Sequence, residues 1–339
     1  MTDEVLFHRS GRLGHVELNR PQAINALTHQ MVGLIHEQLD AWVDDPDVAT
    51  VLITGAGDRG LCAGGDVVAL YDDARTGGDF GERFWRDEYH LDLAIADYPK
   101  PVVAVMDGIV LGGGIGISAH ASHRVVTDRS SIGMPEVGIG LFPDVGGALL
   151  LAHAPGELGT HLALTAGSVG AGDAIAIGMA DTYVPVDRVA DLVTALASTD
   201  VDAALAAVSE PAPDAPLLDE RSWIDAAYAG DDLAAIAGRL DDRPDAAKRL
   251  RRGSPTSCAV ALRALRLARD LDLRATLEQD LRLVVRLQHR ADFVEGVRAQ
   301  VIDKDRSPRW DPPTIEDVDP AAVASLFEPL DHPLFEETS

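Results

Sequence analysis

Hydrophobic and polar positions in the first half of the chain switch repeatedly between strand-like and helix-like spacing. Residues 5–8 and 15–18 favour a β-hairpin. Thr28 can cap a helix whose apolar residues recur every three or four positions, at Met31, Ile35, Leu39 and Trp42. Short, mostly apolar runs typical of strands lie at residues 48–54, 102–106, 124–127 and 180–185. Alternating strands and helices predict an α/β fold.

The strand pattern fades after about residue 200. Residues 201–208 and 231–240 are rich in alanine and favour helices, with a proline-containing stretch between them. Residues 257–292 carry a long helical pattern, and prolines interrupt the chain near its end. We therefore predict an α/β core with the active site over residues 1–200 and a helical C-terminal region over residues 201–339.

Composition is that of an ordinary globular protein, with 46% hydrophobic and 25% charged residues. No apolar run is long enough to span a bilayer, so we expect no membrane partner. The first residues are acidic and lack a basic-then-apolar leader, which favours a cytoplasmic location. Cys62 and Cys258 are far apart and have no metal-ligand spacing, so we expect free thiols and no metal.

The formal net charge of −26 argues against nucleic acid as a partner, because a polyanion would be repelled by most of the surface. A polyanionic ligand would require a local basic patch. Only Lys100, Lys248 and Lys304 are lysines among the 29 basic residues, so arginine must supply most phosphate contacts. This scarcity of lysine also weakens any Schiff-base mechanism.

Residues 135–147 place two carboxylates in an otherwise apolar segment. Glu136 and Asp144 are separated by eight positions, among glycines, prolines and apolar residues. A carboxylate in such surroundings is costly to ionise and has a shifted pKa, which makes both residues candidates for chemistry. The ordinary alternatives are a turn-capping role for Glu136 and a helix N-cap role for Asp144.

A glycine-rich turn lies upstream, at residues 107–116. The pattern indicates a strand end that leads through Gly112, Gly113 and Gly114 into a helix of small residues. Glycine lets a backbone N–H approach a ligand closely, and a helix N-terminus favours developing negative charge. Exposed amides beside buried carboxylates suit acyl chemistry through an oxyanion.

These segments resemble the crotonase (enoyl-CoA hydratase/isomerase) superfamily and, within it, the 3-hydroxyisobutyryl-CoA hydrolase branch. The resemblance covers nearly the whole chain and implies a spiral of ββα units, an acyl-CoA substrate and no cofactor, since CoA is part of the substrate. It leaves the formation of a homo-oligomer open. The matching segments are residues 19–27, 62–66, 112–116 and 134–147, then 254–257, 292–299 and 302–305.

The resemblance also implies roles for individual residues. The amides of Gly65 and Gly113 would point at the thioester oxygen, and Glu136 would attack the carbonyl or activate water. Asp144 would hold the attacking water or the substrate hydroxyl. Further residues placed at the substrate by their matching positions are Glu88, Ala23, Ala63 and Asp66, with Arg20 and Arg59 as candidates for the CoA phosphates.

Gly116 departs from the pattern of the two-carboxylate hydratases, which carry glutamate at this position. The absence of this glutamate counts against hydration of an enoyl double bond. The expected reaction is hydrolysis of 3-hydroxyisobutyryl-CoA to 3-hydroxyisobutyrate and CoA, a step of valine degradation. The alternatives are an enoyl-CoA hydratase or isomerase on the same fold, and a non-catalytic acyl-CoA-binding protein.

Overall fold

The computed structural model describes residues 3–335 and contains two β-sheets within that range, surrounded by helices. None of the helices in this range combines the length and the apolar character needed to cross a membrane. The strands are β1 (Val5–Ser10), β2 (Leu13–Leu18), β3 (Thr50–Gly55), β4 (Val102–Met106), β5 (Ile109–Leu111), β6 (His123–Val126), β7 (Ser131–Gly133), β8 (Ser168–Val169) and β9 (Thr182–Tyr183).

Helices follow most of the strands and make up nearly all of the chain after β9. The α-helices are α1 (His29–Val43), α2 (Val67–Thr76), α3 (Phe80–Ala96), α4 (Gly113–Ala119), α5 (Gly147–Ala152), α6 (Leu158–Thr165), α7 (Ala171–Ala176), α8 (Val189–Leu196), α9 (Val201–Val208), α10 (Pro216–Asp219), α11 (Arg221–Tyr228), α12 (Leu233–Arg239), α13 (Pro244–Arg252), α14 (Pro255–Ala268), α15 (Leu273–Leu287), α16 (Ala291–Val297) and α17 (Pro320–Ser325).

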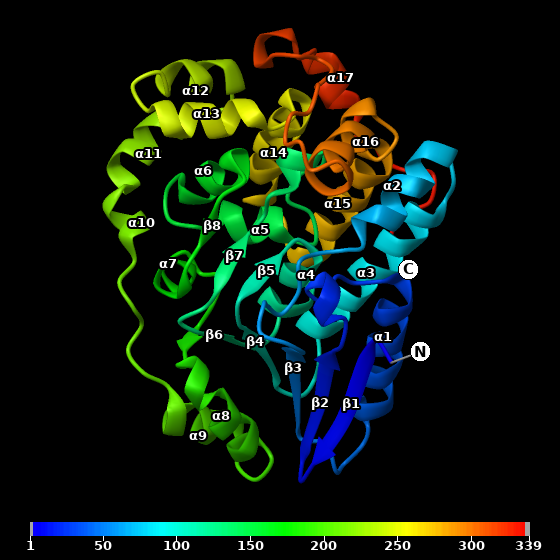
Figure 1. Ribbon diagram of the computed structural model, residues 1–339, viewed down its shortest axis with the longest axis vertical. Helices are drawn as coiled ribbons and strands as arrows, with labels where there is room; N and C mark the ends of the chain where they lie inside the picture. Colours follow the sequence, from blue (N-terminus) through cyan, green and yellow to red (C-terminus); the bar gives the residue numbers. More distant parts are fainter. Residues whose placement is uncertain (1–2, 336–339) are drawn as a thin grey trace. The chain divides into compact units, whose positions relative to one another are not determined.

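The sheets confirm the predicted α/β fold and its ββα units. The larger sheet has the order β1-β2-β3-β4-β6-β9, and only its β1–β2 hairpin is antiparallel (Figure 1). The smaller sheet has the order β5-β7-β8. Successive strands β4 and β5 enter different sheets before α4, and β6 and β7 repeat this division. Each of these two repeats therefore adds one strand to each sheet.

The described chain forms two compact units from interleaved segments. Unit 1 contains residues 3–65, 87–133 and 169–218, and unit 2 contains residues 66–86, 134–168 and 219–335. The sequence suggested one boundary near residue 200, where strand signals fade. The units follow spatial contacts instead, so the segment that carries Glu136 and Asp144 groups with the C-terminal helices.

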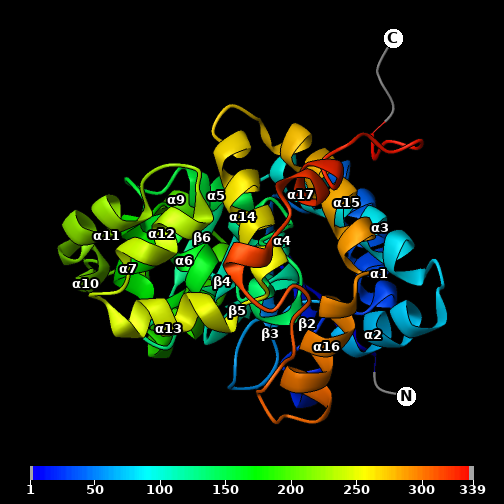
Figure 2. The ribbon, with the colours of Figure 1, turned by 90° about the horizontal axis from the view of Figure 1, so that it is seen from above.

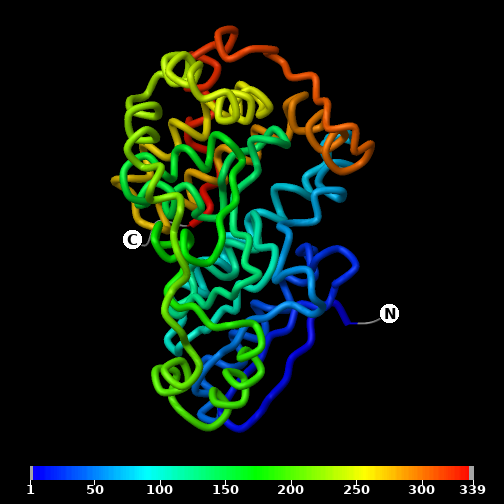
Figure 3. The backbone as a smooth tube through the Cα atoms, turned by 60° about the vertical axis from the view of Figure 1, so that its left-hand side comes forward, coloured from blue at the N-terminus to red at the C-terminus, as the bar shows by residue number. Residues whose placement is uncertain are grey.

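In unit 1, helices cover both faces of the larger sheet. Leu13 belongs to the core that α8 and α9 form with the strands. Its neighbour Gly14 points to the opposite face, where a side chain would meet the Trp42 ring of α1 at 2.9 Å. Figure 3 shows the green helices α8 and α9 beside the blue first strands. The Thr28 cap is confirmed, since its hydroxyl accepts from Met31 N at 3.1 Å.

In unit 2, the helical pattern over residues 257–292 forms two helices rather than one. Asp272 ends the run because its carboxylate accepts from Ala275 N at 2.8 Å and caps α15. Helix α14 begins at a second cap, Ser254, whose hydroxyl accepts from Ser257 N at 3.1 Å. Figure 2 shows α12 beside α14, with which it packs.

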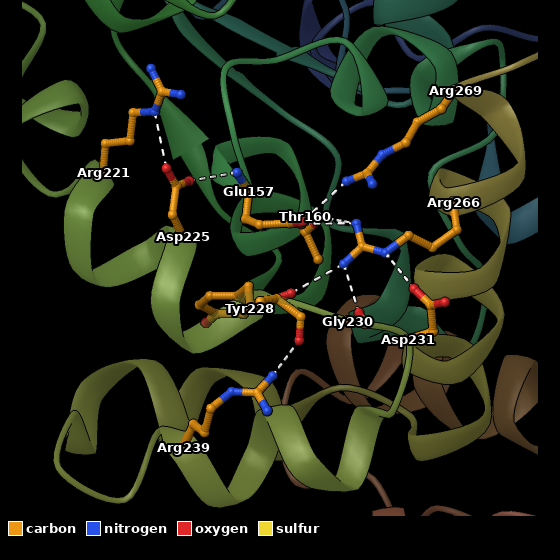
Figure 4. A network of polar contacts seen from close by, with 11 residues as sticks. Glu157, Thr160, Arg221, Asp225, Tyr228, Gly230, Asp231, Arg239, Arg266 and Arg269 are labelled. Carbon is orange, nitrogen blue, oxygen red and sulfur yellow. Dashed lines mark hydrogen bonds and ion pairs between the residues drawn. The ribbon is translucent and has the colours of Figure 1, made fainter.

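Charged side chains tie the helices around α14 together (Figure 4). The half-buried carboxylate of Glu157 accepts from Arg266 at 2.8 Å and from Arg269 at 3.1 Å. Arg266 also contacts Asp231 at 3.1 Å and donates to the carbonyls of Tyr228 and Gly230. One guanidinium thus joins the end of α11 and the start of α12 to α14.

Candidate active site

Two backbone amides lie close together at the glycine turn of unit 1. Gly113 opens α4 after Gly112, whose φ of 49° is in the left-handed region. A Cβ atom added to Gly113 would lie 3.4 Å from the Gly65 nitrogen and 2.3 Å from Glu88 Oε1. Neither amide is found donating to another of residues 3–335. The pair is therefore available to an oxyanion, and its catalytic role stays a prediction.

Two buried carboxylates on α3 line the same turn. Glu88 is 2% exposed, and Asp92, one helical turn later, is fully buried. A Cβ atom at Gly116 would lie 2.6 Å from both Asp92 oxygens. Asp92 thus fills the space that a side chain at position 116 would need. The sequence analysis missed Asp92, although its position on the apolar face of α3 was a usable signal.

The N-terminal motif packs against the loop that carries Ala63. Ala63 N donates to Ile24 O at 2.9 Å, next to Ala23 in the 3₁₀ helix Pro21–Ala23. Both arginines proposed for phosphate binding are engaged within this motif. The Arg20 guanidinium lies 3.2 Å from Glu4 and donates to Ala26 O. Arg59 donates to the carbonyls of Pro21 and Gln22.

In unit 2, Glu136 begins the 3₁₀ helix Glu136–Ile139 and is 6% exposed. Its Oε2 atom is buried and has no hydrogen-bond partner among residues 3–335. Burial raises the pKa of Glu136 well above that of an ordinary glutamate, and the nearby Asp144 carboxylate raises it further. A carboxylate held in this way is a strong nucleophile or base once it has lost its proton.

Asp144 lies in a strained turn that leads into α5. Val145, the next residue, has a φ of 51°, which is rare for a β-branched residue, and Gly146 has a φ of 73°. The N-cap of α5 is Gly146, without a side-chain capping bond, so Asp144 does not cap this helix. Asp144 is 5% exposed.

Asp280, on α15, holds this turn and was missed by the sequence analysis. Its Oδ2 atom accepts from Gly146 N at 2.9 Å, and the residue is fully buried. Burial raises the pKa of Asp280 well above that of an ordinary aspartate, and Asp144 adds to the shift. Asp280 is therefore a positioning residue that acts on the loop bearing Asp144.

Replacing Asp280 by Asn should change how stability depends on pH. The raised pKa means that the native carboxyl keeps its proton over a range in which the unfolded carboxyl, with a pKa near 3.8, has lost it. As pH rises above this value, the free energy of unfolding of the wild type should fall relative to that of Asp280→Asn. Denaturant titrations between pH 4 and 8 measure this difference.

Asp280→Leu is the matched control, because it removes the acceptor as well as the charge. It leaves Gly146 N–H unpaired in a buried site, so we expect it to be less stable than Asp280→Asn by about 1–3 kcal/mol at every pH. A difference between wild type and Asp280→Asn that is the same across the pH range would contradict the assignment.

The predicted site residues are divided between the two units. Gly65, Gly113, Glu88, Ala63 and Ala23 belong to unit 1 with Arg20, whereas Glu136, Asp144 and Asp66 belong to unit 2. Asp66 is half-buried before α2.

Burial raises the pKa of the Cys62 thiol to about 12, so it is not a nucleophile at neutral pH. No cluster of metal-binding side chains occurs within residues 3–335.

Several known proteins are similar to this chain over nearly its whole length. Residues 13–327 match the family described as enoyl-CoA hydratase/isomerase. The mitochondrial 3-hydroxyisobutyryl-CoA hydrolase of Gallus gallus is 36% identical over 96% of this chain and 89% of its own length. A carnitinyl-CoA dehydratase structure from Mycobacterium thermoresistibile is 46% identical, with a TM-score of 0.95 and full coverage of both chains. An enoyl-CoA hydratase structure from Rhodobacter sphaeroides is 44% identical, with a TM-score of 0.92, and covers 97% of this chain and 98% of its own.

Proposed function

The chain belongs to the enoyl-CoA hydratase/isomerase family and has the crotonase fold, and from this premise we propose that it hydrolyses a short acyl-CoA thioester. The preferred substrate is 3-hydroxyisobutyryl-CoA, and the products are 3-hydroxyisobutyrate and CoA. The observation that carries this proposal is Gly116, whose side-chain space is filled by Asp92. Helix α4 therefore offers no second glutamate for adding water to a double bond.

The roles follow from the chemistry of each group. The amides of Gly65 and Gly113 stabilise the oxygen that becomes negative when the thioester carbonyl is attacked. Glu136 either attacks the carbonyl to form a mixed anhydride or takes a proton from the attacking water. On either route a C–O bond forms, the C–S bond breaks, and the thiolate leaves as CoA and gains a proton. On the anhydride route, water then hydrolyses the anhydride, which releases the acid and regenerates the Glu136 carboxylate. Glu88, beside Gly113, binds the acyl end.

A hydratase or dehydratase on the same fold is the second candidate. Two solved structures with those titles share 46% and 44% identity with this chain. Asp92 would then supply a second carboxylate from α3 in place of the missing glutamate on α4. Release of free thiol across a panel of short acyl-CoA substrates, measured together with loss or gain of the enoyl absorbance, separates the two reactions.

Asp144→Asn should lower kcat more than it lowers thermal stability. Asparagine keeps the size and one acceptor oxygen but removes the charge that would orient water or the substrate hydroxyl, so we expect a loss of about 10²-fold or more. Steady-state kinetics and a melting curve on the same preparation measure both effects. Normal kinetics would give Asp144 a structural role only.

Asp232→Asn is a matched control, because Asp232 does cap a helix. Its carboxylate accepts from Ala234 N at 2.9 Å and from Ala235 N at 3.1 Å at the start of α12. Asparagine is about as good an N-cap as aspartate, so this variant should keep both its activity and its melting temperature.

A further inference from the structure

Glu136 lies in a helix that is too short to hold its own position. The 3₁₀ helix Glu136–Ile139 contains only four residues. A helix of about one turn forms few internal hydrogen bonds, so its place in the molecule depends on tertiary contacts. Val137 is fully buried, and Glu136 is 6% exposed. The position of the Glu136 carboxylate is therefore set by the elements of unit 2 that pack around this helix.

Helix α16 packs directly against the backbone of this 3₁₀ helix. Gly140, which follows the helix, has a φ of 79°, and a Cβ atom added to it would lie 2.5 Å from the Asp292 carbonyl. A Cβ atom added to Gly296 would lie 2.6 Å from Ile139 Cα. Both glycines allow the two backbones to approach more closely than any side chain would permit. The position of α16 therefore determines that of the helix that begins with Glu136.

Ser254, the N-cap of α14, joins this helix to α16. Its backbone N–H donates to Val137 O at 2.9 Å. Its hydroxyl donates to Asp292 Oδ2 at 2.5 Å and accepts from Ser257 N at 3.1 Å. Ser254 is fully buried and Asp292 is 2% exposed, so these hydrogen bonds are shielded from water and strengthened by it. One residue thus links α14, α16 and the helix of Glu136.

The burial of Asp292 is more than the capping of α14 requires. A serine caps a helix with its hydroxyl oxygen alone and needs no carboxylate behind it. Burial raises the pKa of Asp292, and the hydrogen bonds from the Ser254 hydroxyl and from Asp311 N, at 2.7 Å, oppose this rise. The charges of Arg290 and Asp311 act on it in opposite directions. A buried carboxylate is costly, so we infer that Asp292 fixes the orientation of Ser254.

We propose that Ser254 and Asp292 form a positioning pair for Glu136, an inference that rests on the proposed function. Asp292 holds Ser254 through its hydroxyl, and Ser254 holds the 3₁₀ helix through Val137 O. The pair thereby keeps the Glu136 carboxylate in the direction in which it meets the thioester carbonyl or the attacking water. A reacting group must be held within a fraction of an ångström of its productive place, and a displacement of about 1 Å can cost about 10²-fold in rate.

The test compares Ser254→Ala and Asp292→Asn with the wild type in the full-length chain. Each substitution removes one side of the hydrogen bond, so we expect kcat to fall about 10-fold or more with KM little changed. The rise of kcat/KM with pH should also move to lower pH. A less firmly held Glu136 is more accessible to water, which lowers its raised pKa while the Asp144 carboxylate remains in place. A smaller fraction of folded protein would lower kcat without moving this pH profile.

The double variant tests whether the two residues act as a unit. Ser254→Ala alone leaves the buried Asp292 carboxylate short of a donor, and Asp292→Asn in the same chain removes that charge. We therefore expect the double variant to lose no more kcat than the more impaired single variant. Losses that multiply would overturn the pair. Asp200→Ala is the control, because it removes a helix cap in unit 1, where Asp200 accepts from Ala203 N at 2.9 Å. It should keep the wild-type kcat and pH profile.

Hydrogen exchange separates this inference from the proposed function. Gly138 N donates to Pro135 O at 2.9 Å and Leu141 N to Glu136 O at 3.0 Å, in the segment that the pair holds. Both single variants should exchange these amides about 10-fold or more faster, while the amides of α12 keep their wild-type rates. If the wild type releases thiol from no acyl-CoA, the proposed function fails and the exchange rates still test the pair. Unchanged exchange at both amides, or an equal acceleration in α12, would overturn the inference.

Discussion

Glu136→Gln should lower the kcat for thiol release by about 10²–10⁴-fold or more while acyl-CoA binding stays close to that of the wild type. Glutamine keeps the shape of the side chain in its buried place at the start of the 3₁₀ helix. It cannot attack a carbonyl or take a proton from water. Steady-state kinetics with calorimetry of acyl-CoA binding measure both effects. Glu37→Gln, at an exposed position of α1, is the control and should behave as the wild type.

The pH profile tests the same assignment independently. Burial and the Asp144 carboxylate raise the pKa of Glu136, and the residue must be deprotonated to act as nucleophile or base. The kcat/KM of the wild type should therefore rise with pH through this raised pKa, above the ordinary range of a glutamate. Asp144→Asn removes one of the two causes, so in its residual activity the rise should move to lower pH. A variant Glu136→Gln that keeps most of its activity would refute the central assignment.

The second large effect concerns the choice of reaction. The kcat/KM for hydrolysis of 3-hydroxyisobutyryl-CoA should exceed that for hydration of crotonyl-CoA by about 10²–10⁴-fold. Hydration needs two positioned acid–base groups, and Gly116 removes the one that α4 would carry. Attack on the carbonyl needs the oxyanion amides of Gly65 and Gly113, and these are present. Thiol detection and enoyl absorbance on one enzyme preparation give both rates.

The variant Asp92→Asn tests whether Asp92 acts as the second carboxylate of a hydratase. Gly116→Glu is not a usable test, because a Cβ atom at this position would already lie 2.6 Å from the Asp92 carboxylate. If Asp92 supplied the second carboxylate of a hydratase, Asp92→Asn would abolish a rapid crotonyl-CoA hydration. Comparable rates on the two substrates, or hydration without thiol release, would favour the hydratase or dehydratase over the hydrolase.

The candidate site shows what a local pattern can reveal. Glu136 and Asp144 stand out because they are the carboxylates of an otherwise apolar segment. The glycine turn stands out because three glycines follow one another at residues 112–114. Asp92 and Asp280 look like ordinary helix carboxylates among many in an acidic chain. Both lie on the apolar faces of their helices, and this was the only signal available. Asp92 matters because it lies against Gly116, and Asp280 matters because it accepts from Gly146 N. In both cases the glycine is distant from its aspartate in the sequence and close to it in space.

The sequence by itself determined the elements whose causes are local. The Thr28 cap, the strand β4 and the glycine turn follow from residues within a few positions of one another. Only the tertiary structure decided which segments form each unit, that Gly146 is held by Asp280, and that Ser254 joins Val137 to Asp292. These contacts join residues separated by tens of positions or more. Their physical reason is packing and charge in three dimensions, which the spacing of residues along a chain does not encode.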